Sequence, residues 1–242
     1  EGAQEEAAAP QPAVTVGCDA YTPFSYVDVD GNLTGIDVEL AREAFSRMGY
    51  APEFRIINWE EKKELLRSGQ IDCIWSSFTM DGREDEYRWA GPYMKSHQVV
   101  AVNPDSDIRT LSDLADRAIA VQSTTKPEDL IRSGSLPLLR KVLSVQKRDL
   151  IFILLSKGYV DAIAAHDTAV DQFMAECGLE FRILDEPLLT VGLGVAFDRD
   201  DARGLDKQLD QMLDEMRADG TIRTIIEKYL TDADRYLEDE DG

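Results

Sequence analysis

Residues 54–79 read FRIINWEEKKELLRSGQIDCIWSSFT and contain two apolar runs separated by an amphipathic segment. Residues 54–57 predict a strand, because a short apolar run bounded by polar residues is typical of a buried strand. Asn58 then begins a helix that Gly69 ends. The apolar run at residues 71–75 predicts a second strand. The stretch therefore forms a strand, helix, strand unit, which is typical of a parallel sheet.

The same alternation continues on both sides of this unit. Further strands are expected at residues 14–17, 98–102, 118–121, 141–145, 160–164, 179–184 and 191–197. Further helices are expected at residues 38–48, 111–116, from Pro127 onward, 149–157, 168–176, 205–218 and 221–229. The predicted fold class is therefore α/β, and the second series of elements repeats the logic of the first.

The length and the connectors suggest two lobes. A chain of 242 residues can form two cores of ordinary size. Residues 103–106 read as a connector, so we expect residues 14–102 and 190–242 in one discontinuous lobe and residues 103–189 in the other. Residues 1–13 have alanine as almost their only apolar type, and we interpret them as a flexible tether.

Composition excludes several classes of partner. The chain has 47 acidic and 26 basic residues and a formal net charge of −21. Such a charge repels phosphate backbones, so we expect no nucleic acid partner and interpret the acidity as a source of solubility. No apolar run is long enough to cross a membrane. The three cysteines and two histidines show no metal-ligand spacing, so we expect no metal and no cofactor.

Polar and aromatic side chains follow the predicted strands, where ligands of open α/β sheets bind. The candidate ligand-binding residues are Tyr21, Trp59, Ser76, Ser77, Phe78, Thr79, Arg83, Gln122, Thr124, Thr125 and Asp167. An arginine can clasp a carboxylate with two parallel bonds, a buried aspartate can pair with an ammonium, and aromatic faces can desolvate the site. The set is therefore suited to a zwitterion, and it contains no nucleophile paired with a base.

Each candidate also has a purely structural interpretation. Arg83 lies among acidic residues and could form a surface ion pair. The aromatic candidates could belong to the core. Thr125 and Asp167 could simply cap the helices that follow them. The spacing of the residues does not decide between these alternatives.

The chain resembles the family 3 solute-binding proteins of ABC importers, which bind polar amino acids, from Val14 to about Tyr229. Among the phrases that carry the resemblance are Tyr21-Thr22-Pro23-Phe24, Gly35-Ile36-Asp37-Val38-Glu39-Leu40-Ala41, Gly69-Gln70-Ile71-Asp72, Ser76-Ser77-Phe78-Thr79 with Arg83, Gln122-Ser123-Thr124-Thr125, His166-Asp167 and Ala218-Asp219-Gly220-Thr221. The segment from Thr79 to Arg83 is one residue shorter than the family pattern, which leaves the shape of this loop open.

The resemblance implies a type II periplasmic-binding fold, in which two Rossmann-like lobes joined by two strands close on a ligand like a hinge. It implies that Arg83 binds the α-carboxylate of a free amino acid, with Thr79 and Thr125, and that Asp167 binds its α-ammonium. Tyr21 and Trp59 would enclose the side chain, Phe78 would line the same wall, and Gln122 would touch its far end.

The expected role is therefore an extracytoplasmic, monomeric binding protein that delivers an amino acid to ABC permease subunits, with a lipid anchor as one means of attachment. Two other readings stay open. One is the sensing domain of a receptor. The other is an enzyme of the cyclohexadienyl dehydratase type, which would need an unpaired acid in the cleft. The sequence offers no compelling candidate for such an acid beyond Asp19, so no enzymatic activity is expected.

Overall fold

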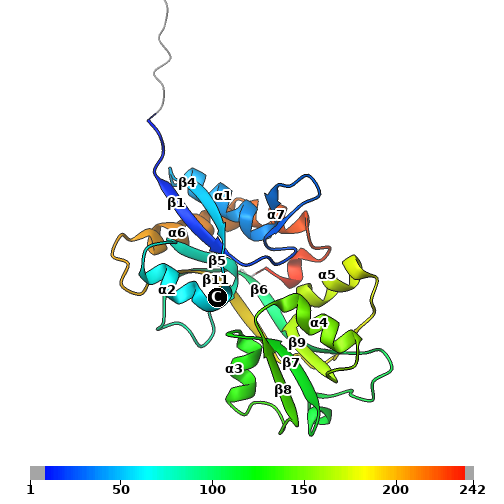
Figure 1. Ribbon diagram of the computed structural model, residues 1–242. Helices are drawn as coiled ribbons and strands as arrows, with labels where there is room; N and C mark the ends of the chain where they lie inside the picture. The colour runs from blue at the N-terminus through cyan, green and yellow to red at the C-terminus, as the bar shows by residue number, and fades with distance from the viewer. Residues whose placement is uncertain (1–8, 238–242) are drawn as a thin grey trace, which may run out of the picture.

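A nine-stranded sheet runs through the whole computed structural model, which describes residues 9–237 (Figure 1). Its strands are β1 Ala13–Cys18, β4 Ala51–Ile56, β5 Cys73–Thr79, β6 Arg88–Val102, β7 Ala118–Gln122, β8 Lys141–Val145, β9 Ala162–His166, β10 Arg182–Ile183 and β11 Leu189–Phe197. A separate small hairpin pairs β2 Tyr26–Val27 with β3 Leu33–Thr34. The strand order is β4-β1-β5-β11-β6-β9-β7-β8, with β10 on β6.

Seven α-helices and three short 3₁₀ helices accompany the sheet in the described part of the chain. The α-helices are α1 Ile36–Arg47, α2 Lys62–Arg67, α3 Lys126–Arg132, α4 Arg148–Ser156, α5 Asp167–Cys177, α6 Leu205–Ala218 and α7 Thr221–Glu227. The 3₁₀ helices are η1 Trp59–Glu61, η2 Leu111–Leu114 and η3 Ala233–Arg235.

The architecture is α/β, as expected, and two lobes divide its elements (Figure 1). In the first lobe, β1 lies between β4 and β5, and all three are parallel. In the second lobe, β7 lies between β8 and β9, again in parallel. The helices α1, α6 and α7 accompany the first lobe, and α3, α4 and α5 accompany the second (Figure 1).

The strands β6 and β11 join the lobes. The strand β6 is 15 residues long, pairs with β11 from Arg88 to Gln98, and pairs with β9 from Gln98 to Ala101. Residues 98–101, which the sequence pattern assigns to the first lobe, thus pair with a strand of the second, and the lobe boundary near residue 102 stays a prediction. We propose that the remaining lobe boundaries lie where the connectors predict. Most of the expected tether, residues 1–8, lies outside the described residues.

Helix α1 illustrates how the sequence dictates the local structure. Its core face, which includes Leu40, Ala44 and Phe45, is buried, and acidic residues occupy its first turn. Gly35 precedes the helix with φ of 124°, and a β-carbon there would come within 2.3 Å of the Phe24 carbonyl oxygen. Only glycine fits this position, because both the positive φ and the close backbone contact exclude a side chain.

Several elements differ in length from the prediction. The strand β5 continues through Ser76–Thr79, because Phe78 and Thr79 pair with β11 instead of entering a loop. The expected helix at residues 111–116 is the short η2, and the expected strand at residues 179–184 is reduced to β10. The helices at residues 205–218 and from 221 begin where the sequence predicts.

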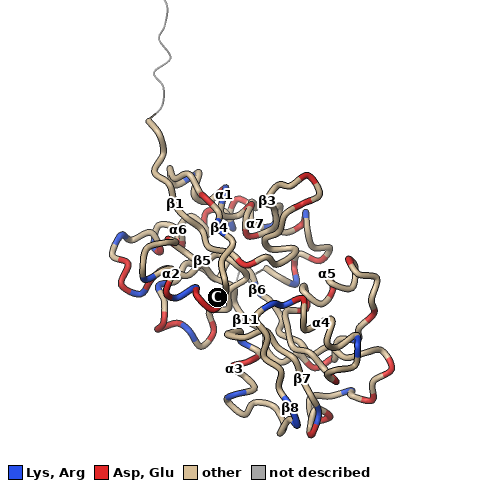
Figure 2. The backbone as a smooth tube through the Cα atoms, in the orientation of Figure 1, with Lys and Arg blue, Asp and Glu red and all other residues tan. Residues whose placement is uncertain are grey.

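The acidic residues are spread over the loops of both lobes, as Figure 2 shows, and are interspersed with basic ones. This distribution agrees with the interpretation of the net charge as a source of solubility. Within residues 9–237, no helix has the length and apolar character needed to cross a membrane.

Candidate functional site

A cleft lies between the two lobes at the carboxyl ends of their parallel strands. Its lining consists of Tyr21, Trp59, Ser76, Ser77, Phe78, Thr79, Arg83, Gln98, Gln122, Thr124, Thr125, Lys126, Pro127, Arg148, Ile151, Ala164, Ala165 and His166. All the candidate residues from the sequence except Asp167 are in this set. Their roles in binding stay predictions, but the fold brings them to one place.

Arg83 reaches the cleft from the turn that follows β5. Its backbone N–H donates to the Met80 carbonyl at 2.9 Å, and Gly82 allows the turn with φ of 80°. The Trp89 indole N–H donates to the Arg83 carbonyl at 3.0 Å, which fixes the backbone from the other side. The guanidinium lies 5.4 Å from the centre of the Phe78 ring, and Arg83 is only 8% exposed. Arg83 is therefore a buried residue and not the exposed one that a surface ion pair requires.

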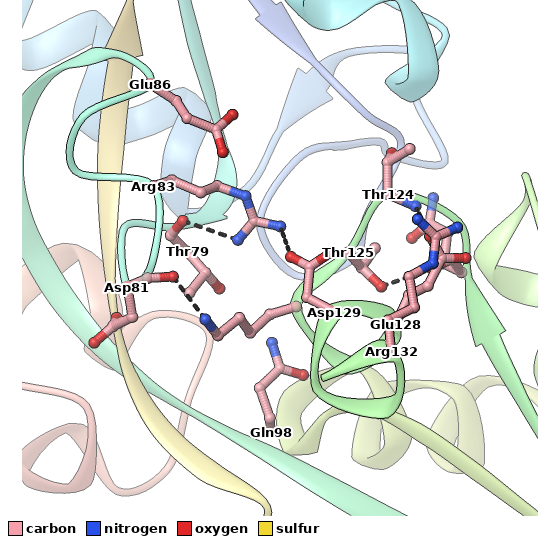
Figure 3. A network of polar contacts seen from close by, with 12 residues as sticks. Thr79, Asp81, Arg83, Glu86, Gln98, Thr124, Thr125, Glu128, Asp129 and Arg132 are labelled. Carbon is pink, nitrogen blue, oxygen red and sulfur yellow. Dashed lines mark hydrogen bonds and ion pairs between the residues drawn. The ribbon is translucent and has the colours of Figure 1, made fainter. Parts of the chain in front are cut away.

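A carboxylate of the second lobe faces this guanidinium. Arg83 Nη2 donates to Asp129 Oδ2 at 2.8 Å, across the cleft from the turn after β5 to α3 (Figure 3). Arg83 Nη1 lies 3.5 Å from the Thr79 carbonyl oxygen, so this second contact is long. Asp129 is thus the acid that pairs with Arg83 in this structure. The sequence pattern did not assign Asp129 to the cleft.

Two cleft residues on opposite lobes have left-handed backbone conformations. Ser77 has φ of 48° and Thr124 has φ of 57°. Such conformations are costly for residues other than glycine and cluster at functional sites. The Ser77 N–H donates to the carboxylate of buried Asp37 at 2.6 Å, and burial raises the pKa of Asp37 to about 7. The Thr124 N–H donates to Glu128 at 3.2 Å.

Aromatic rings form one wall of the cleft. Trp59 and Phe78 pack edge to face, with their centres 5.1 Å apart. Beside them, Lys62 Nζ lies 4.6 Å from the Trp59 ring centre and donates to Thr124 Oγ1 of the second lobe at 3.1 Å. Burial, with the nearby Arg83 charge, lowers the pKa of Lys62 to about 8. The wall therefore combines an apolar surface with a partly desolvated cation.

Arg148, at the start of α4, lies over the Tyr21 ring. Its guanidinium carbon is 3.3 Å from the ring centre, and its side chain is 14% exposed. Asp19 Oδ2 lies 3.5 Å from Arg148 Nη2 and accepts from Gln122 Nε2 at 3.1 Å. Asp19, the acid considered for catalysis, is therefore already shared by two partners.

His166 lies at the end of β9 and is held neutral. Its Nδ1 is 2.5 Å from Ser96 Oγ, and its Nε2 is 3.2 Å from Gln98 Nε2. Burial lowers the pKa of His166 to about 3, helped by the charge of Arg148. Gln98 Oε1 and Ser77 Oγ are buried and find no hydrogen-bond partner within residues 9–237.

Asp167 does not line the cleft, in contrast to the expectation. Its side chain is 1% exposed, and its Oδ2 lies 2.7 Å from Arg235 Nη2 and 3.3 Å from His97 Nδ1. Its Oδ1 accepts the Thr168 N–H at 2.8 Å. The reason is the C-terminal segment around η3, which brings a cation of this chain to the carboxylate.

The lobes also contact each other around the rim of the cleft. Glu60 accepts from Ser123 at 2.8 Å and from Gln146 at 2.6 Å. Lys126 Nζ donates to the Asp81 carbonyl at 2.9 Å. These bonds join the first lobe to the second, so the structure has a closed cleft.

Sequence reasoning missed Gln98, Lys126, Arg148 and His166 of the lining, and Asp129 opposite Arg83. Arg148 could have been found by the rule applied to the other strands, because it follows the strand at residues 141–145. His166 stands out in the sequence only as the neighbour of Asp167. Asp129 carries no such signal, since it lies inside a helix and meets Arg83 only through lobe closure. Within residues 9–237, no group of three or more His, Cys, Asp or Glu side chains is arranged to hold a metal ion.

Comparison with known proteins places the chain among others of this architecture. Residues 14–232 match the family described as bacterial extracellular solute-binding proteins, family 3. The histidine-binding periplasmic protein of Salmonella typhimurium is 28% identical over 240 residues, which cover 95% of this chain and 91% of that protein.

Two solved structures share the fold. A mutant of ArgBP from T. maritima is 28% identical, with a TM-score of 0.81, and the match covers 91% of this chain and 96% of that chain. The ancestral amino acid-binding protein AncCDT-1, a precursor of cyclohexadienyl dehydratase, is 27% identical, with a TM-score of 0.79, and the match covers 90% of this chain and 95% of that chain.

Proposed function

Because the chain belongs to the bacterial extracellular solute-binding proteins of family 3, we propose that it is the amino-acid-binding subunit of an ABC importer. One observation carries the proposal. A buried arginine, Arg83, extends from the first lobe into a cleft, where a carboxylate of the second lobe takes one of its donors. A ligand carboxylate has the same chemistry and can take the same donors when it replaces Asp129.

The other lining residues suit the rest of an amino acid. Thr79 and Thr125, on opposite lobes, lie in the lining beside Arg83 and can complete the α-carboxylate site. The unpaired oxygens of Gln98 and Ser77 can accept from the α-ammonium. Trp59 provides an apolar face for the side chain, and Tyr21 lines the cleft beneath the Arg148 guanidinium. In this assignment Asp167 supports the cleft wall through Arg235 instead of contacting the ligand.

Binding requires the cleft to open and close again. The bonds from Glu60 and Lys126 across the rim have to separate before a ligand enters, and they form again around it. Because β6 and β11 are the strands that run through both lobes, we propose that they act as the hinge. The ligand then favours the closed form by contacts with both lobes, and that form is the one that ABC permease subunits would bind.

Titration of Arg83→Ala tests the proposal. Isothermal titration calorimetry against the twenty common amino acids first identifies those that bind the unmodified protein. We expect Arg83→Ala to weaken their affinity by about 30-fold or more, since loss of one partner of a buried charge pair costs about 2 to 5 kcal/mol. The control is Arg67→Ala, whose side chain is 74% exposed in the same lobe. An affinity of Arg83→Ala within twofold of the unmodified protein would contradict the proposal.

We propose no turnover for this cleft. A dehydratase acting on prephenate or arogenate needs an acid that is free to protonate a leaving group. The described lining contains no acidic residue, and nearby Asp19 is committed to Gln122 and Arg148. Incubation with either compound should leave it unchanged.

The relatives of this chain support a site of action outside the cytoplasm. The matching family is extracellular, and the Salmonella relative is periplasmic. We propose that the protein works as a monomer at the outer face of the membrane, held there by a lipid anchor or free in the periplasm.

A further inference from the structure

The charged residues that line the cleft all carry the same sign. They are Arg83, Lys126 and Arg148, and the described lining contains no aspartate or glutamate. Lys62 adds a fourth cation just behind the aromatic wall. A ligand that enters this cleft therefore meets positive charge at several separate points, and a net negative ligand is favoured.

The acidic residues at the rim offer a ligand no free carboxylate, because each is already engaged. The pairs are Asp19 with Gln122 and Arg148, Glu60 with Ser123 and Gln146, Asp81 with the Gly192 N–H, and Asp129 with Arg83. Asp167 is held by Arg235 outside the lining. Asp19, Glu60, Asp81 and Asp167 are thus not left to receive a cationic side chain, and Asp129 is released only at Arg83, where the α-carboxylate would lie.

Arg148 is the cation with the most unused donors. A guanidinium carries five N–H groups, yet the two acceptors that Arg148 has in the described chain are the Ala20 carbonyl and Asp19, both at 3.5 Å. Neither distance is that of a strong hydrogen bond. Because only 14% of the side chain is exposed, water cannot fully replace the missing acceptors. The group is therefore placed to receive an anion.

We propose that the ligand is an amino acid with an anionic side chain, held by two arginines. Arg83 binds its α-carboxylate in place of Asp129, and Arg148 binds its side-chain carboxylate. This inference rests on the proposed function of the cleft and names its class of ligand. The ammonium is received by the unpaired oxygens of Gln98 and Ser77.

The same geometry disfavours a long cationic side chain. Such a side chain would need the face of Tyr21, but the Arg148 guanidinium lies on that face at 3.3 Å from the ring centre. It would also need Asp19, which Arg148 and Gln122 share. Entry of a second guanidinium would bring two like charges together in a site with little solvent.

The test compares ligands that differ only in charge. L-glutamate and L-glutamine have nearly the same shape, so titration of both into the unmodified protein isolates the effect of the side-chain carboxylate. We expect L-glutamate or L-aspartate to bind at least tenfold more tightly than its neutral amide, L-glutamine or L-asparagine. L-arginine and L-histidine should bind more weakly than the acidic pair.

Variants of Arg148 then locate the effect. In Arg148→Gln, the affinity for the acidic ligand should fall at least tenfold, while that for its amide changes less than threefold. Arg148→Lys keeps the charge and should retain part of the preference, which also covers the case that Arg148→Gln folds poorly. The control is Arg140→Gln on the same lobe, where the side chain is 57% exposed, and it should leave both affinities unchanged.

The outcomes separate this inference from the proposed function. If no amino acid binds, the proposed function itself fails. If amino acids bind but L-arginine or L-histidine binds tightest, the function stands and the anionic ligand is refuted. The anionic ligand is likewise refuted if Arg148→Gln weakens the binding of the acid and of its amide equally, because Arg148 would then not distinguish the charge of the side chain.

Discussion

Asp129→Asn should tighten the binding of an amino acid, because Asp129 competes with the ligand for Arg83. The Asp129 side chain is 49% exposed and the Arg83 side chain is 10% exposed, and their closest atoms are 2.8 Å apart. An exposed ion pair contributes about 0 to 1 kcal/mol, and a hydrogen bond to a buried charge about 1.5 to 3 kcal/mol. With one partner half in solvent, we expect about 1 kcal/mol. Release of this contact should therefore raise the affinity about fivefold.

Calorimetry on the tightest-binding amino acid measures this change, with Asp149→Asn as the control. Asp149 is an exposed acid of the same lobe, so its loss changes the net charge equally without touching Arg83. Small-angle scattering of the ligand-free variant gives a second readout, since loss of an interlobe bond should shift the population toward more open forms. Weaker binding by Asp129→Asn would refute the reasoning, because Asp129 would then assist Arg83 in the bound form instead of competing with the ligand.

Two further predictions concern stability. Because the pKa of His166 is lowered from 6.5 to about 3, the native state resists protonation that the unfolded chain accepts, so stability should fall as the pH drops from about 6.5 toward 3. This group contributes a slope of about 1.4 kcal/mol per pH unit. Urea unfolding at pH 7 and pH 5 should therefore show a smaller loss of stability for His166→Gln than for the unmodified protein, and equal losses would contradict this. Arg235→Ala leaves Asp167 buried without its arginine and should lower the free energy of unfolding by about 3 kcal/mol, the low end for a broken buried pair because the Arg235 side chain is 47% exposed, with amino-acid affinity within threefold. A large loss of affinity in folded Arg235→Ala would instead point to Asp167 as a ligand contact.

The sequence predicts most of the cleft because strand ends are readable. Apolar runs such as residues 14–17 and 118–121 mark central strands, and parallel strands of one lobe bring their carboxyl ends to the same edge. The strand pattern therefore places Tyr21 and Gln122 each at the ligand-binding edge of its own lobe, and the family resemblance then assigns both to one cleft. Arg148 could have been assigned in the same way.

What the sequence hides depends on contacts between distant segments. Nothing near Asp167 indicates that Arg235, 68 residues later, takes its carboxylate. The first part of β6, before the predicted strand at residues 98–102, is hidden for another reason, because Gly91-Pro92 reads as a turn. In the structure this dipeptide lies inside the strand, and β11 accommodates it with a shift in register between Leu193 and Val195.

The place of β11 in the sheet affects how the chain can assemble. This strand is made after the whole second lobe, yet it lies between β5 and β6 in the sheet. A nascent or truncated chain that stops before Leu189 would present β5 without its neighbour, and every residue of β5 is buried in the finished protein. Such bare edges invite pairing with other chains. The edge of β5 in the first lobe is therefore covered only after β11 has been synthesised. The second lobe is an uninterrupted segment of the chain and can fold first.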